Sequence, residues 1–107
     1  MNRTALVVLA SFVLAGAAHA AKGDAQAGKG KAAACVACHG ESGVSAAPEF
    51  PKIAGQHADY LATALRHYKA GKRKNPIMAG QVANLSEKDM LDLAAYYASQ
   101  PGLAIRY

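Results

Sequence analysis

The sequence predicts an all-α fold of three to four helices in a single domain. Its 107 residues leave room for one domain. No stretch shows the strict alternation of apolar and polar residues that marks a half-buried strand, whereas several stretches repeat apolar residues at helical spacing. Clusters of glycine and proline separate these stretches, as expected for loops between helices.

The first twenty residues have the pattern of an export signal. Arg3 precedes an apolar run over residues 5–16, and Ala18, His19 and Ala20 have the small-residue form at which signal peptidases cut. About a dozen apolar residues is short of the roughly 20 that span a bilayer. We therefore predict a cleaved signal peptide at residues 1–20, a domain at residues 21–107 and a periplasmic location.

The first helix is expected from residue 25 to about residue 37. Asp24 is a suitable N-cap, because its side chain can accept from the first free backbone N–H groups. Cys35, Cys38 and His39 then fall at the C-terminal end of this helix. Residues 40–55 contain several glycines and two prolines and are expected to form a long loop, which compact domains usually keep for function.

A second helix is expected from residue 59 to about residue 69. Its apolar and tyrosine side chains recur at helical spacing and form one stripe, made of Tyr60, Leu61, Ala64, Leu65 and Tyr68. Residues 71–85 follow it and contain Pro76 and Gly80, so this segment is expected to be irregular.

The last helix is expected to begin after Ser86 and to end at about Gln100. Ser86 and Asp89 have capping-box spacing, and a Pro-Gly pair follows Gln100 and stops the helix. One face of this helix carries a buried stripe, made of Met90, Leu93, Ala94 and Tyr97.

The two cysteines lie in a C-x-x-C-H pattern, which three chemistries use. A redox dithiol belongs at a helix N-terminus on a βαβ scaffold, which is absent from this pattern of helices. Zinc needs four ligands, and the adjacent Cys38 and His39 cannot comfortably point at one metal. A c-type haem fits better, because two thiols three residues apart face the same way on a helix and the next imidazole can bind iron.

The chain resembles the class I cytochromes c, both the small bacterial monohaem type and single domains of the dihaem type. The segments that carry the resemblance are GDAQAGKGKAAACVACHG, FPKIAGQHADYL and NPIMAGQVANLSEKDMLDLAAYYASQ. The resemblance implies helices packed around one haem c, attached through Cys35 and Cys38, with His39 bound to its iron. It also implies a methionine as the second axial ligand, from a loop before the last helix.

Two methionines and two histidines compete for the second axial position. Met78 lies in the segment expected to be irregular, where an extended backbone could present its thioether, and we predict that it is the ligand. Met90 belongs to the stripe of the last helix and is interpreted as a packing residue. His57 and His67 are the rival ligands, although helix-start or helix-surface positions explain both.

Other contacts to the haem follow only from the resemblance. It implies that the backbone carbonyl of Pro51 orients His39, and that Leu93 and Tyr97 lie against the macrocycle. It also suggests that Tyr96 packs near Gly28. Many relatives place a tryptophan near a haem carboxylate, but this chain has none. The candidates left for that role are Lys52, Gln56 and Arg66.

Two filled axial positions leave no site for a substrate, so the sequence predicts an electron-transfer protein rather than an enzyme. We expect a soluble periplasmic one-electron carrier that serves membrane respiratory complexes or periplasmic reductases and oxidases, and that meets the membrane only peripherally. One alternative is a haem subunit docked to a larger oxidoreductase. Another is a haem peroxidase or ligand sensor, which would need an open axial site.

Charge gives a weaker indication of partners. The net charge of the chain is +5, and an exported haem domain is not expected to bind nucleic acid. A basic cluster could be a solvated loop or a docking patch for an acidic redox partner, and it comprises Lys69, Lys72, Arg73 and Lys74.

Overall fold

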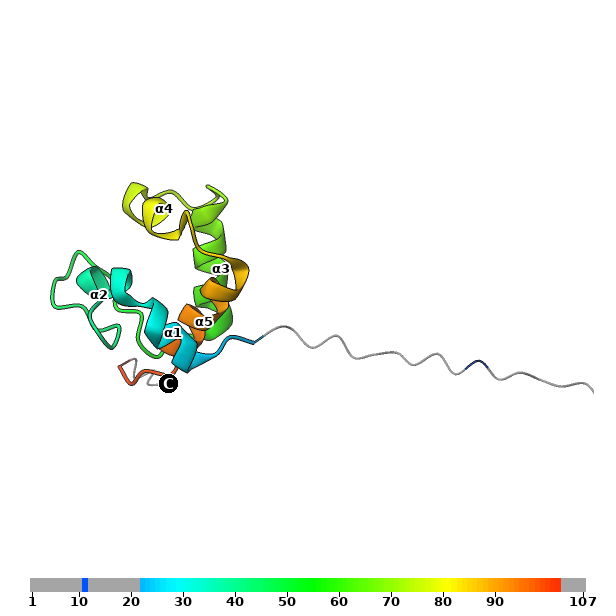
Figure 1. Ribbon diagram of the computed structural model, residues 1–107. Helices are drawn as coiled ribbons and strands as arrows, with labels where there is room; N and C mark the ends of the chain where they lie inside the picture. The colour runs from blue at the N-terminus through cyan, green and yellow to red at the C-terminus, as the bar shows by residue number, and fades with distance from the viewer. Residues whose placement is uncertain (1–10, 12–21, 103–107) are drawn as a thin grey trace, which may run out of the picture.

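A computed structural model describes Ser11 and residues 22–102, so the predicted signal peptide lies almost wholly outside the described residues. The described part of the chain contains five helices and no strand, which confirms the all-α prediction (Figure 1). No helix in this part is long and apolar enough to cross a membrane. The helices are α1 (Ala25–Lys31), α2 (Ala33–His39), α3 (Ala58–Lys69), α4 (Pro76–Val82) and α5 (Glu87–Ala98).

The first and last helices cross at a point where α1 has no side chain. Gly28 is buried, and a Cβ atom placed on it would overlap the backbone carbonyl oxygen of Asp92 and lie 2.8 Å from the Cβ of Tyr96. Only glycine allows α1 to approach the backbone of α5 this closely. Tyr96 therefore packs beside Gly28, as the resemblance suggested.

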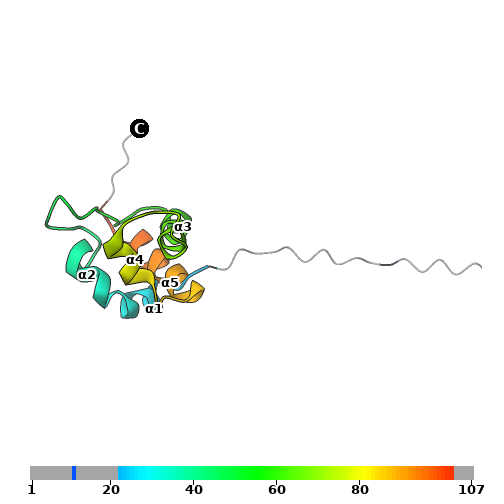
Figure 2. The same cartoon turned by 90° about the horizontal axis from the view of Figure 1, so that it is seen from above.

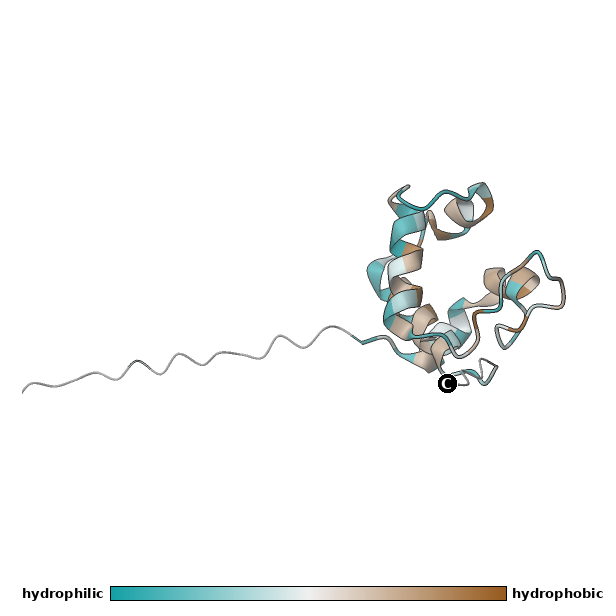
Figure 3. Cartoon of the chain, turned by 180° about the vertical axis from the view of Figure 1, so that it is seen from behind, coloured by the Kyte–Doolittle hydropathy of each residue, from teal (hydrophilic) through white to brown (hydrophobic). Residues whose placement is uncertain are grey.

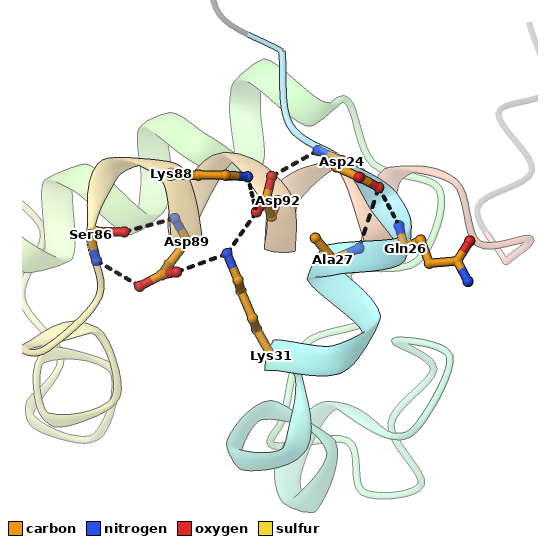
Figure 4. Close-up of polar contacts among 8 residues, drawn as sticks. All are labelled: Asp24, Gln26, Ala27, Lys31, Ser86, Lys88, Asp89 and Asp92. Carbon is orange, nitrogen blue, oxygen red and sulfur yellow. Dashed lines mark hydrogen bonds and ion pairs between the residues drawn. The ribbon is translucent and has the colours of Figure 1, made fainter.

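A buried carboxylate holds the same two helices together (Figure 4). Asp92 of α5 is 1% exposed. Its Oδ1 accepts from the Asp24 backbone N–H at 2.8 Å, and its Oδ2 accepts from Lys31 Nζ at 2.6 Å and from Lys88 Nζ at 2.8 Å. These bonds, with that from the Asp24 N–H first, hold the pKa of Asp92 well below its usual range. Asp92 is therefore a charged carboxylate with three donors, which is how a protein can keep such a group buried.

The predicted first helix is two helices with a junction at Ala32. Asp24 caps α1 as expected, because its side chain accepts from the N–H groups of Gln26 and Ala27 at 2.9 and 3.3 Å. At the junction, the Ala32 N–H donates to the Lys29 carbonyl and the Ala32 carbonyl accepts from Cys35. Hydrogen bonds between residues three apart, as in a 3₁₀-helix, tighten the turn and change the direction of the chain. Ala32 is buried against Leu93, Tyr96 and Tyr97 in the core.

The segment predicted to be irregular contains α4, so that prediction is wrong for residues 76–82. Asn75 is the N-cap, and its side chain accepts from Ile77 N–H at 3.0 Å and from Met78 N–H at 3.1 Å. Pro76 occupies the first turn, where its missing N–H costs nothing. Proline in mid-helix breaks a helix, but directly after an N-cap asparagine it starts one. Met78 therefore lies on a helix and not on extended backbone.

The remaining helices begin close to their predicted positions. Ala58 begins α3, one residue before the expected start, and α3 ends at Lys69. Ser86 and Asp89 form the predicted capping box, with each side chain accepting from the backbone N–H of the other. Arg66 Nε of α3 donates to Glu87 Oε1 of α5 at 2.7 Å, which links these helices at their surface.

We expect Gly28→Ala to lower the free energy of unfolding by about 1–3 kcal/mol, because overpacking forces backbone shifts. Gly30→Ala is the matched control, since nothing lies within 4 Å of a Cβ at that position of the same helix. The control should gain about 0.5–1 kcal/mol from the better helix propensity of alanine. Denaturant unfolding of both variants measures the difference, and equal stabilities would contradict close packing at Gly28.

Candidate cofactor cleft

The helices enclose a cleft of about 330 Å³. In Figure 1 they outline an open C, with α1 and α5 at its base and with α2 and α4 at its two ends. Figure 2 shows the same arrangement from above. Residues from α2, α3, α4, α5 and the loop after α2 line the cleft. Its volume falls within the range of about 300–1,000 Å³ that is typical of ligand sites.

Cys35, Cys38 and His39 form one wall of the cleft, at the end of α2. Both cysteines are free and half-buried. His39 Nδ1 lies 2.8 Å from the carbonyl oxygen of Pro51. A carbonyl only accepts, so Nδ1 carries a proton, and in the neutral imidazole Nε2 then has the lone pair that a metal needs.

The loop that supplies Pro51 is fastened to α5. The Tyr96 hydroxyl donates to the Glu41 carbonyl at 2.8 Å, and the Gly55 N–H donates to the Tyr97 carbonyl at 2.9 Å. These bonds lie on either side of Pro51 in the sequence. The loop that contacts the His39 ring is thus positioned by the same helix that forms the base of the fold.

Met78 lies on α4 and lines the same cleft. Its side chain is half-buried, and its backbone is fixed by the Asn75 cap. Met90 is only 4% exposed but does not line the cleft, so it has the position of a packing residue. His57 occupies the N-cap position of α3 without a side-chain capping bond, His67 is exposed on α3, and neither belongs to the cleft lining.

Leu93, Ala94 and Tyr97 of α5 also line the cleft. Tyr97 is 3% exposed, and burial raises the pKa of its hydroxyl. Within the described residues this hydroxyl has no hydrogen-bond partner. Burial likewise raises the pKa of the nearby Cys35 thiol, so both groups are neutral at physiological pH.

The apolar stripe of α3 completes the cleft. All of its predicted members belong to the lining, namely Tyr60, Leu61, Ala64, Leu65 and Tyr68. Figure 3 shows apolar positions on both α3 and α4, two of the elements whose residues line the cleft. A cleft with so many aromatic and aliphatic walls accepts a large apolar group.

These residues fit a covalently attached haem. Cys35 and Cys38 offer two thiols on one helical turn, and His39 offers an imidazole nitrogen with a free lone pair. Met78 adds a thioether from another helix of the same cleft. Nitrogen and soft sulfur ligands of this kind are those that bind haem iron in proteins.

Of the three residues considered as partners of the haem carboxylates, two line the cleft and one does not. Lys52 and Gln56 line the cleft, whereas Arg66 pairs with Glu87 and does not. The lining also contains two polar residues that sequence analysis did not place in a cleft, namely Arg73 and Asn75. Asn75 was detectable from the Asn-Pro helix start, but Arg73 was hidden among neighbouring lysines.

A helical cleft that presents C-x-x-C-H on one wall and a methionine on another defines a protein of the c-type haem class. The chain belongs to the cytochrome c family, whose sequence pattern matches residues 20–100. Membership implies a covalently bound haem c with its iron and a role in electron transfer.

Cytochrome c4 of Pseudomonas aeruginosa is 51% identical to this chain over 100 residues, which cover 94% of this chain and 49% of the relative. Cytochrome c-554(548) of Halomonas halodenitrificans is 44% identical over 81 residues, which cover 73% of this chain and 98% of the relative. The crystal structure of cytochrome c4 from Pseudomonas stutzeri has a TM-score of 0.72 and 48% identity, over 76% of this chain and 47% of that chain. The chain thus spans about half the length of the cytochrome c4 relatives and matches a single domain of them.

Proposed function

We propose that this protein is a periplasmic one-electron carrier in which His39 and Met78 are the axial ligands of a single haem c. The observation that carries the proposal is the shared cleft, where Met78 and the Pro51-oriented His39 both belong to the lining. Bound haem would supply an iron that cycles between ferrous and ferric states.

In such a carrier, each pair of cleft residues would have a separate role. Cys35 and Cys38 would hold the cofactor covalently, and His39 and Met78 would fill both axial positions and so exclude substrate. Leu93 and Tyr97 would cover the macrocycle and exclude water, which strengthens electrostatic effects inside the cleft. Ligation by the Met78 thioether would favour the ferrous state and raise the potential.

A subunit role is the second candidate. Thiosulfate dehydrogenase (TsdBA) from Marichromatium purpuratum has a solved structure that is 31% identical to this chain, with a TM-score of 0.69 over 89% of this chain and 22% of that chain. A relative from Thiomonas intermedia is named thiosulfate dehydrogenase electron acceptor. These names favour a haem domain that exchanges electrons with a larger oxidoreductase. Stable co-purification with such an enzyme would distinguish this role from that of a free carrier.

The mature protein is expected to start at Ala21 and to carry one haem. Intact-mass measurement of protein expressed in a bacterium that attaches haem c tests both expectations. The double variant Cys35→Ser, Cys38→Ser is the control and should lose the haem mass. A wild-type mass equal to that of the full-length or haem-free chain would contradict the proposal.

Met78→Ala should open the iron to added cyanide or carbon monoxide and lower the midpoint potential, because an axial ligand is lost. Met90→Leu should leave the spectrum unchanged and cost less than about 1.5 kcal/mol of stability, since the two side chains have similar volumes. Visible spectra with and without added ligand measure the first effect. The opposite pattern would assign the axial position to Met90, and no spectral change in either variant would favour His57 or His67.

The proposed docking patch is smaller than the sequence suggested. Lys69 donates to the Leu85 carbonyl and Arg73 turns to the cleft, whereas Lys72 and Lys74 are exposed and form no ion pair with the described residues. Lysines in such a loop can steer an acidic redox partner. We therefore define the docking patch as Lys72 and Lys74.

Changing both patch lysines to Gln should slow electron transfer to an acidic redox partner severalfold at low salt, because steering acts on the encounter rate. The gap should close near 0.15 M salt, where the Debye length is about 8 Å. Lys22→Gln with Lys29→Gln removes the same charge from the base of the fold and is the control. Stopped-flow rates that are equal for both double variants at every salt concentration would contradict a role of Lys72 and Lys74 in docking.

A further inference from the structure

The helix that carries Met78 is weak by itself. α4 has seven residues, and isolated helices shorter than about 12–15 residues are marginal in water. Gly80, a poor helix former, lies in its interior. In the described part of the chain, α3 is the one helix against which α4 packs extensively, and Val82 is the one buried residue of α4. The stability of α4 therefore depends strongly on how its N-terminus is capped.

Asn75 binds every backbone N–H group at the start of α4. Pro76, the first helical residue, has no N–H. The side-chain oxygen of Asn75 accepts from Ile77 N–H at 3.0 Å and from Met78 N–H at 3.1 Å. Its backbone carbonyl accepts from Ala79 N–H at 2.9 Å. One residue thus satisfies all the donors that the first turn of a helix leaves without partners inside it.

Met78 is one of the residues that this cap holds. Its own N–H donates to Asn75, and its side chain lines the cleft but is only half-buried. Ile77, which precedes it, is 58% exposed. Burial therefore holds the first turn of α4 weakly, and loss of the Asn75 side chain would free two N–H groups there and let the turn open more often.

We propose that Asn75 is a positioning residue, whose cap of α4 controls how firmly Met78 keeps the second axial position of the haem. The inference rests on the proposed function, because it requires Met78 as a ligand. Asn75 acts through the backbone of α4 and not by touching the iron. An added ligand enters this position only after Met78 leaves it, so the rate at which the ferric protein binds cyanide measures the opening of this turn.

The test compares Asn75→Ala with Ser86→Ala. Each variant removes an N-cap, but Ser86 caps α5, which does not carry Met78, and Ser86 does not line the cleft. We expect Asn75→Ala to bind cyanide about fivefold faster than wild type, which converts to about 1 kcal/mol, the typical contribution of an N-cap. Ser86→Ala should bind cyanide at the wild-type rate. Stopped-flow spectra of the ferric holoprotein measure both rates.

Two further variants test whether the cap is the cause. Asn75→Ser keeps a capping oxygen but loses the amide, so it should bind cyanide at nearly the wild-type rate. Gly80→Ala should act in the opposite direction and slow cyanide binding severalfold, because alanine strengthens the helix. Nothing lies within 4 Å of a Cβ at Gly80, and this residue does not line the cleft.

Amide hydrogen exchange of the holoprotein gives a readout that does not depend on cyanide. In Asn75→Ala the N–H groups of Ile77 and Met78 should exchange faster than in wild type, because they lose their acceptor. The N–H groups of α5 should keep their wild-type rates. Ser86→Ala should show the reverse, with faster exchange at the start of α5 and wild-type rates in α4.

The outcomes separate this inference from the proposed function. Met78→Ala that binds cyanide no faster than wild type would reject the proposed function, and this inference with it. If Met78→Ala binds cyanide fast but Asn75→Ala behaves like Ser86→Ala, only the role of Asn75 is overturned. If Asn75→Ala fails to fold, Asn75→Ser and Gly80→Ala decide. Fast cyanide binding in the first, or an unchanged rate in the second, would equally contradict control through the cap of α4.

Discussion

The crossing of α1 and α5 is the constraint on which the rest of the structure depends. Gly28 lets the two backbones meet, and the buried carboxylate of Asp92 ties both ends of α1 to α5 through Asp24 and Lys31. With that crossing fixed, α1 leads directly into the helix that carries the cysteines. The adjacent face of α5 then supplies Leu93 and Tyr97 to the cleft.

Much of the fold could be predicted because its signals are local. Asp24 and the pair of Ser86 and Asp89 are capping residues, and their effects need only a few neighbouring N–H groups. The stripe of α3 was predicted for the same reason, since periodicity shows which side chains share a face. The junction at Ala32 could not be predicted, because it depends on packing against distant residues of α5.

Some residues of the candidate site could likewise be predicted from local sequence, and others could not. The C-x-x-C-H pattern places its three residues together in any helix, so their proximity followed from spacing alone. The side chain of Arg73 is different. In sequence it is one of several adjacent basic residues, and only the folding of its loop onto α3 turns it toward Tyr68 and separates it from Lys72 and Lys74. Local charge patterns cannot distinguish a residue that lines a cleft from its solvated neighbours.

The bond between Asp24 and Asp92 also concerns the timing of folding, because it joins residues 68 positions apart. α1 has seven residues, and isolated helices shorter than about 12–15 residues are marginal in water. A ribosome releases α1 before the other described helices, but α5, its packing partner, is made after all of them. α1 therefore lacks its main packing partner until α5 has been made, and removal of α5 would also take away the surface on which the first helix packs.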